Sequence, residues 1–204
     1  MIGCGGPKPA VDAGATPQAP ARPPLAALAT QAVALLPAQY LRAGDSASAG
    51  GGLGPSRQVL ASLDSAIVAE LTARGTARQW VMPDALTRSA KRNPAFTSDP
   101  HALSAELLRA GVRRSNPRLG EPLASQMRSL VALTEARYGL IPVELRFEPM
   151  PAGGTRAILR LVLVDARLAE SRWTGDVSAE VPSPNTAAIV GGLARRVADL
   201  LVAP

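Results

Sequence analysis

The residue types that most often carry out catalysis are scarce in this chain. Among 204 residues there is one histidine, His101, and one cysteine, Cys4. A serine nucleophile at Ser46, within Gly44-Asp45-Ser46, would need a histidine late in the chain, and His101 lies in its middle. No carboxylate pair and no spacing of metal ligands supplies an alternative site. The sequence therefore predicts a protein that is not an enzyme and that needs neither a metal nor a cofactor.

Cys4 stands in a context that indicates another kind of chemistry. Met1-Ile2-Gly3-Cys4 resembles the end of a bacterial lipoprotein signal, in which an apolar and a small residue precede a lipid-modified cysteine. The small residues let the peptidase reach the bond, and the thiol accepts the diacylglyceryl group. Basic and apolar segments should precede this motif. Either the reading frame begins farther upstream, or the protein is cytoplasmic and its Gly-Cys pair is accidental.

The residues after Cys4 favour the lipoprotein interpretation. Residues 5–29 are rich in Pro and Ala, and such a segment buries too little apolar surface to offset the entropy of ordering it. We expect residues 1–4 to be the remnant of a lipobox, residues 5–29 to be a disordered tether, and residues 30–204 to form a single α/β domain. The domain would then be periplasmic and anchored to the membrane through lipidated Cys4.

The stretch from Leu140 to Val181 predicts three consecutive antiparallel strands. In the first strand four apolar residues alternate with polar ones and should share one face, with the other face toward water or a partner: Ile141, Val143, Leu145 and Phe147. Residues 157–165 are apolar at nearly every position, as is typical of a middle strand. In the third strand Trp173 and Val177 should both face the core.

Helices and short strands surround this meander in the sequence. Residues 32–37 and 78–82 predict two short strands. Hydrophobic periodicity and capping residues predict helices over five stretches, namely 56–74, 84–92, 99–110, 122–138 and 185–202. The predicted fold class is α/β, with a mixed sheet of about five strands. Two N-terminal strands and a C-terminal antiparallel three-strand meander pack with four to five helices.

This order of elements resembles a known superfamily. Four stretches carry the likeness, namely Ala32-Val33-Ala34-Leu35-Leu36-Pro37, the helix from Leu60 to Gly75, Trp80-Val81-Met82-Pro83, and the run from Leu161 to Arg167 followed by Trp173-Thr174-Gly175. The chain resembles the amino-terminal domain of TolB and the periplasmic domain of the curli-secretion lipoprotein. In layout it is most similar to the lipoproteins that activate penicillin-binding proteins. The resemblance implies a lipidated cysteine, a tether and a non-enzymatic domain.

The net charge of +6 is concentrated in one part of the chain. Between Arg74 and Arg118 there are nine basic residues against three acidic ones. We predict that this segment contacts the partner through five arginines: Arg88, Arg92, Arg109, Arg113 and Arg114. A solvated helical surface is the competing interpretation. Nucleic acid is not expected as a partner, because Phe96 is the segment's only aromatic residue after Trp80 and base stacking needs more than one such ring.

These observations lead to one main functional prediction and one alternative. The main prediction is a lipid-anchored periplasmic domain that docks without catalysis on an envelope protein, with no nucleic acid and no small-molecule substrate. The alternative is a soluble α/β protein that binds a small ligand or hydrolyses a substrate. The alternative has little support in the sequence, because His101 has no recognisable catalytic partners.

Cys4 is expected to become the lipidated first residue of the mature protein. With the complete reading frame expressed, mass spectrometry should find acyl chains on Cys4, and Cys4→Ser should release the protein from the membrane fraction. A wild-type protein that remains soluble and unmodified would contradict this prediction.

Overall fold

The computed structural model describes residues 23–42, 54–75, 78–111, 117–151, 153–181 and 185–202. The predicted lipidation site Cys4 and the predicted contact residues Arg113 and Arg114 lie outside these ranges, as does Gly44-Asp45-Ser46. The first described residues already belong to the folded part, since Leu25 and Leu28 are buried and the Leu25 amide donates to the carbonyl of Leu200 at 2.8 Å.

A five-stranded mixed sheet forms the centre of the molecule. Its strands are β1 (Val33–Leu35), β2 (Trp80–Val81), β3 (Tyr138–Pro149), β4 (Thr155–Asp165) and β5 (Glu170–Val181), in the spatial order β2-β1-β3-β4-β5. The short strand β1 pairs in parallel with β2 and with β3, and the three long strands pair antiparallel. This confirms the predicted fold class, including the two N-terminal strands and the meander.

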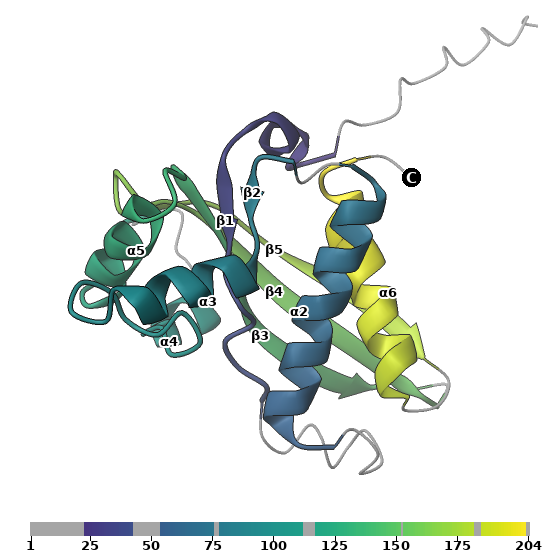
Figure 1. Ribbon diagram of the computed structural model, residues 1–204. Helices are drawn as coiled ribbons and strands as arrows, with labels where there is room; N and C mark the ends of the chain where they lie inside the picture. The colour runs from purple at the N-terminus through teal and green to yellow at the C-terminus, as the bar shows by residue number, and fades with distance from the viewer. Residues whose placement is uncertain are drawn as a thin grey trace, which may run out of the picture.

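Helices cover the two faces of the sheet unequally. In the described chain they are the 3-10 helix η1 (Ala26–Thr30) and the α-helices α2 (Ser56–Ala73), α3 (Pro83–Arg92), α4 (Glu106–Arg109), α5 (Leu123–Ala132) and α6 (Thr186–Asp199). Helices α2 and α6 lie side by side along the long strands, whereas α3, α4 and α5 gather at one end of the sheet (Figure 1). Two hydrophobic cores result, one beneath α2 and α6 and one beneath α3 and α5.

The amphipathic pattern of the two long helices explains their position. Helix α2 buries Val59, Leu63, Ile67 and Leu71, which recur every fourth residue and so form one apolar stripe. Helix α6 begins at a side-chain cap, because the Asn185 carboxamide oxygen accepts the amides of Ala187 at 2.9 Å and Ala188 at 3.3 Å. Both predicted helices are therefore present, with slightly shorter bounds.

Strand β3 departs from the predicted two-residue alternation. The register with β4 shifts by one residue between Pro142 and Glu144, so Val143 is an extra residue on β3. Ile141 and Val143 consequently pack in the core beneath α3 and α5, whereas Leu145 and Phe147 pack beneath α2 and α6. The prediction that all four share one face was wrong, because one inserted residue moves every later side chain to the opposite face.

Two predicted helices are much shorter than expected. The stretch 99–110 is helical only in α4, because residues 99–105 form a turn in which the Leu103 amide bonds to Oε1 of Gln39 at 3.0 Å. The stretch 122–138 is helical only to Ala132, and Tyr138 already pairs with Asp165 in the sheet. In both stretches tertiary hydrogen bonds outweigh local helix propensity.

Asp165, at the end of β4, holds the turn into β5 together. Its side chain is fully buried, and its carboxylate accepts Nε and Nη2 of Arg137 at 3.0 and 2.8 Å. The backbone amides of Arg167 and Leu168 donate to the same carboxylate at 3.1 and 3.2 Å. Burial alone would raise the pKa of Asp165, but these hydrogen bonds and the Arg137 charge lower it. Asp165, near the end of the Leu161–Arg167 run that carries the sequence resemblance, thus has a structural role.

Trp173 of strand β5 lies on the core-facing side of the sheet, as predicted. Trp173 packs against the core beneath α2 and α6, and Val177 on the same face is buried. Trp173 itself is only half-buried. Its ring lies over Gly175, where a Cβ atom would overlap the ring, so a side chain at residue 175 would require the Trp173 ring to shift.

Leu63→Ala is expected to lower the free energy of unfolding by about 2–5 kcal/mol, because it deletes a fully buried side chain and leaves a cavity. Leu107→Ala is the matched control, since Leu107 is 72% exposed and its truncation should have little effect. Chemical denaturation of both variants tests this. Equal losses would show that α2 does not pack as described.

Candidate functional site

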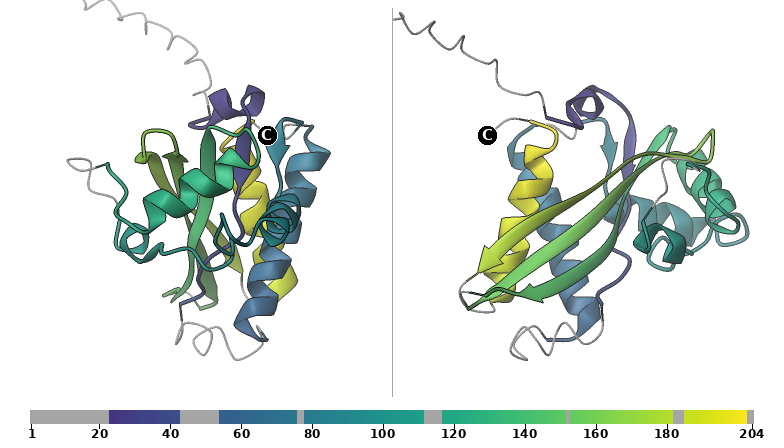
Figure 2. Two further views of the ribbon diagram at one scale, coloured as in Figure 1. Left: turned by 60° about the vertical axis from the view of Figure 1, so that its left-hand side comes forward. Right: turned by 180° about the vertical axis from the view of Figure 1, so that it is seen from behind.

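The side of the meander opposite α2 and α6 is only partly covered. Helices α3, α4 and α5 cover it near the β1 end, and the remainder is bare of helices when the molecule is seen from behind (Figure 2). We call this remainder the open face. Its side chains come from β3, β4 and β5: Glu144, Arg146, Glu148, Arg156, Ile158, Arg160, Thr174, Asp176, Ser178 and Glu180.

The charges of the open face form cross-strand pairs. Asp176 accepts Nη2 of Arg146 at 2.9 Å and Nε of Arg160 at 2.9 Å. Burial opposes ionisation of Asp176, yet these two guanidinium groups lower its pKa below its usual value. Arg156 and Glu180, directly opposite each other on β4 and β5, pair at 2.6 Å. Arg160–Asp176 and Arg156–Glu180 join the neighbouring strands β4 and β5, and Arg146 of β3 reaches across β4 to Asp176, so the pairs order the arginine side chains.

A further pair ties the edge of the open face to the N-terminal part of the chain. Glu144 is 3% exposed, and its Oε2 accepts Nη2 of Arg42 at 2.8 Å. The inserted Val143 makes this possible, since Val143 and Glu144 lie on the same side of β3. The open face and Arg42 together hold four arginines and four acidic residues, and these eight residues carry no net charge: Arg42, Arg146, Arg156 and Arg160 against Glu144, Glu148, Asp176 and Glu180.

The three predicted contact arginines that the structure describes do not gather into one patch. Arg109 lies 4.0 Å over the ring of Tyr40, and its carbonyl accepts Nη1 of Arg160 at 2.7 Å, so it borders the open face. Arg88 and Arg92 are exposed on α3, where Nε of Arg92 reaches the carbonyl of Arg88 at 3.4 Å. Across the described ranges no contact joins either of them to Arg109.

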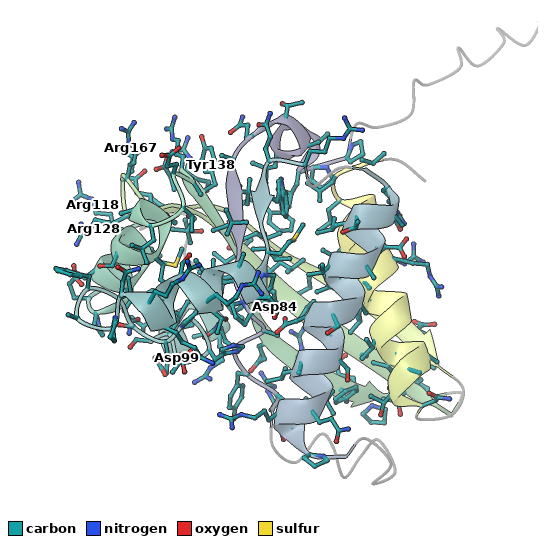
Figure 3. All side chains as sticks on the ribbon, in the orientation of Figure 1. Asp84, Asp99, Arg118, Arg128, Tyr138 and Arg167 are labelled. Atoms are coloured by element: carbon teal, nitrogen blue, oxygen red, sulfur yellow. The ribbon has the colours of Figure 1, made fainter. Side chains whose placement is uncertain are left out.

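A second basic cluster was missed by the sequence analysis. Arg118, Arg128 and Arg167 lie at the α5 end of the molecule, away from Asp84 and Asp99 (Figure 3). Arg128 forms an ion pair with Glu121 at 2.9 Å. Arg118 and Arg167 are exposed, and their side chains form no ion pair with a described residue. The three residues come from separate segments, so no local sequence pattern identifies the cluster.

A groove of about 760 Å³ separates α2 from α3 and the turn after it. Asp64 of α2 is half-buried in this groove, and its Oδ1 accepts the amide of Ala38 at 2.8 Å. Burial raises the pKa of Asp64 to about 7, and the negative charge of Asp84 adds to this effect. Asp84 lies at the end of α3 that faces α2 (Figure 3). Lys91 and His101 also line the groove.

The groove does not assemble a hydrolytic site from its described residues. Nε2 of His101 lies 3.3 Å from Oγ1 of Thr87, which could in principle serve as a nucleophile. Asp99, however, accepts the backbone amide of His101 at 2.9 Å, and no carboxylate is bonded to the imidazole ring. A base without an orienting acid lacks the third member of a catalytic triad. No group of three His, Cys, Asp or Glu residues in the described ranges could hold a metal ion.

Among the described residues, no helix combines the length and the hydrophobicity that crossing a membrane requires.

The stability of the protein is expected to fall as the pH rises between about 4 and 7, because folded Asp64 titrates near 7 and its ordinary value is 3.8. In that window the folded state binds more protons than the unfolded state. Asp165 and Asp176, whose pKa values are lowered, act in the opposite sense and only below about pH 4.

Asp64→Asn should therefore flatten this dependence, since a carboxamide oxygen still accepts the Ala38 amide and carries no charge. Thermal unfolding of wild type and Asp64→Asn across this pH window is the measurement. Parallel curves for the two proteins would exclude Asp64 as the titrating group.

Comparison with known proteins gives matches only among solved structures. No family model and no curated protein matches the chain. The C-terminal domain of LpoB from Salmonella enterica is similar, with 13% identity, a TM-score of 0.40, and coverage of 74% of this chain and 83% of that domain. Lipoprotein GNA1162 from Neisseria meningitidis shares 17% identity with a TM-score of 0.38, covering 75% and 82%. A PelC dodecamer from Paraburkholderia phytofirmans shares 11% with a TM-score of 0.36, covering 85% and 89%.

Identities and TM-scores this low leave the function to be argued from the chain's own residues.

Proposed function

We propose that this chain is a lipid-anchored periplasmic protein whose domain docks, without catalysis, on a protein of the cell envelope. The open face is the docking surface. One observation carries the proposal: a broad sheet face, left uncovered by helices, on which charges of both signs are held in fixed positions by cross-strand pairs.

The charge balance of the open face favours a protein partner over nucleic acid or an anionic lipid surface. Four of its arginines, counting Arg42 beside it, are already paired with acidic residues of the same chain, whereas a polyanion needs a surplus of positive charge. A folded protein with the complementary pattern can match both signs, and such patterns give specificity and orientation.

The ordering of the arginines supports the same conclusion. Arg146 and Arg160 are both held by Asp176 at 2.9 Å, and Arg160 is fixed further by the carbonyl of Arg109 at 2.7 Å. A side chain already fixed in the free protein loses less conformational entropy on binding, at about 0.5–1.5 kcal/mol for each one ordered. The open face is thus pre-organised for docking.

The proposed periplasmic, membrane-anchored location rests on the N-terminal residues. Cys4 would carry the lipid, and the Pro-rich residues that follow it would let the domain stand away from the membrane surface.

The docking surface can be tested by exchanging one ion pair. Arg156→Glu combined with Glu180→Arg retains an ion pair between directly opposite residues and inverts the charges that a partner meets. We expect unchanged stability and loss of the envelope-protein adducts that a photo-crosslinker at exposed Glu148 forms in living cells.

The matched control is the same exchange at the α5 end, Arg128→Glu combined with Glu121→Arg, which should leave the adducts intact. Arg88→Glu combined with Arg92→Glu tests the arginines predicted from the sequence. Adducts that survive the exchange on the open face and disappear with the α3 variant would place the contact on α3 and contradict the proposal.

A further inference from the structure

Strand β5 is the outermost strand of the sheet on the side away from β2. Among the described residues its outer edge is paired at its beginning, where Arg118 forms an antiparallel bridge with Glu170. The Ser171 amide donates to the carbonyl of Pro117 at 2.7 Å, and within the described ranges no backbone bond follows it along this edge. From Arg172 onward, no described strand pairs with the outer edge of β5.

Two grooves run beside this free edge. One groove, of about 740 Å³, runs along Ser171 to Asp176 and is also lined by Gly111 and Pro117. The other, of about 680 Å³, follows Ser178 to Glu180 and is bounded by α6. The free edge therefore has open space beside it along its length. β5 contains no proline that would block pairing, and a long unprotected edge is a template for a further strand.

We infer that two copies of this chain pair antiparallel through their β5 edges about Asp176, forming one continuous ten-stranded sheet. The free edge runs from Arg172 to Val181, so its middle lies at Asp176 and Val177. A two-fold axis perpendicular to the sheet keeps each face on its own side. Opposite residues of the two strands must then project from the same face. This holds only if the axis lies midway between the two copies of one residue, so that this residue is opposite itself.

Side-chain size selects Asp176 as that residue. Pairing about Asp176 places Trp173 opposite Ala179 of the second copy and Gly175 opposite its Val177, so that a large residue meets a small one each time. Shifting the register by two residues in either direction sets Trp173 against a valine. The Trp173 ring would reach the groove beside Ala179, where α6 presents Gly192 with its backbone close to the sheet.

The polar face fits the same register. Thr174 and Ser178 of the two copies lie opposite each other and can exchange hydroxyl hydrogen bonds. The two Asp176 carboxylates meet at the axis, and each is already neutralised by Arg146 and Arg160 of its own chain. At the ends, Arg172 faces Glu180. This self-complementarity favours a second copy over an unrelated strand.

Paired substitutions at exposed positions 174 and 178 test the register. Thr174→Lys with Ser178→Lys places like charges opposite across the axis, whereas Thr174→Lys with Ser178→Glu places opposite charges there. In sedimentation analysis under reducing conditions, we expect wild type and the Lys/Glu variant at twice the chain mass of 21.0 kDa, and the Lys/Lys variant at the single chain mass.

Disulfide formation provides an independent measurement in the full chain carrying Cys4→Ser. Thr174→Cys with Ser178→Cys should form intermolecular disulfides on mild oxidation, because opposite residues of an antiparallel pair lie within disulfide reach. Thr174→Cys alone should not, since its opposite residue remains serine. The two cysteines of one chain are four residues apart on an extended strand and cannot bond to each other.

A wild-type protein that is monomeric throughout would overturn the inference and leave the edge to an extended segment of another protein. A dimer that forms equally in the Lys/Lys variant and gives no disulfide in the double-cysteine variant would overturn it as well. Neither outcome bears on docking through the open face, which is measured with a crosslinker on β3.

Discussion

The inserted residue Val143 is the constraint on which much of this structure depends. Up to Pro142, β3 is buried on both faces between the two groups of helices, and beyond Val143 it belongs to a sheet with one covered and one open face. Without the insertion, Leu145 and Phe147 would point away from α2 and α6. The energetic reason for the bulge is therefore burial of these two side chains, each of which is worth about 1.5–3 kcal/mol.

The same insertion positions the charged pairs. Because Val143 and Glu144 project to one side, Glu144 lies at the boundary between the core beneath α3 and α5 and the open face, where Arg42 can reach it. Glu148 and Arg146 follow in alternation along β3. Pairing across β4 to Asp176 then orders the arginines. A packing requirement in the core thus determines the geometry of a surface that carries no core residue except Ile158.

Two surfaces with different properties emerge from one sheet. The open face offers fixed charges of both signs and suits a folded protein that matches them. The β5 edge offers backbone hydrogen-bonding groups and a size pattern that matches itself, which suits a second copy. Asp176 belongs to both, so pairing through β5 would join two open faces into one larger surface and would present a partner with two equivalent sites.

The sequence by itself determined the element order, the strand–helix alternation and the meander, because each depends on local periodicity and turn residues. The stripe in α2 and the apolar run of β4 are examples. The prediction that the protein is not an enzyme rests on composition, since His101 and Cys4 are the only residues of their kinds. The charged surface could not be read in this way. Arg42, Arg109 and Asp176 are far apart in the chain and meet only in the folded sheet.

Tertiary structure alone decided the face assignment of β3, the early end of α5 and the short length of α4. In each case a long-range interaction outweighed a local preference: the register with β4, the pairing of Tyr138 with Asp165, and the hydrogen bond from Leu103 to Gln39. A one-residue bulge leaves the sequence alternation of apolar and polar residues unchanged, so the alternation that predicted a single face was correct on either side of Val143 and wrong across it.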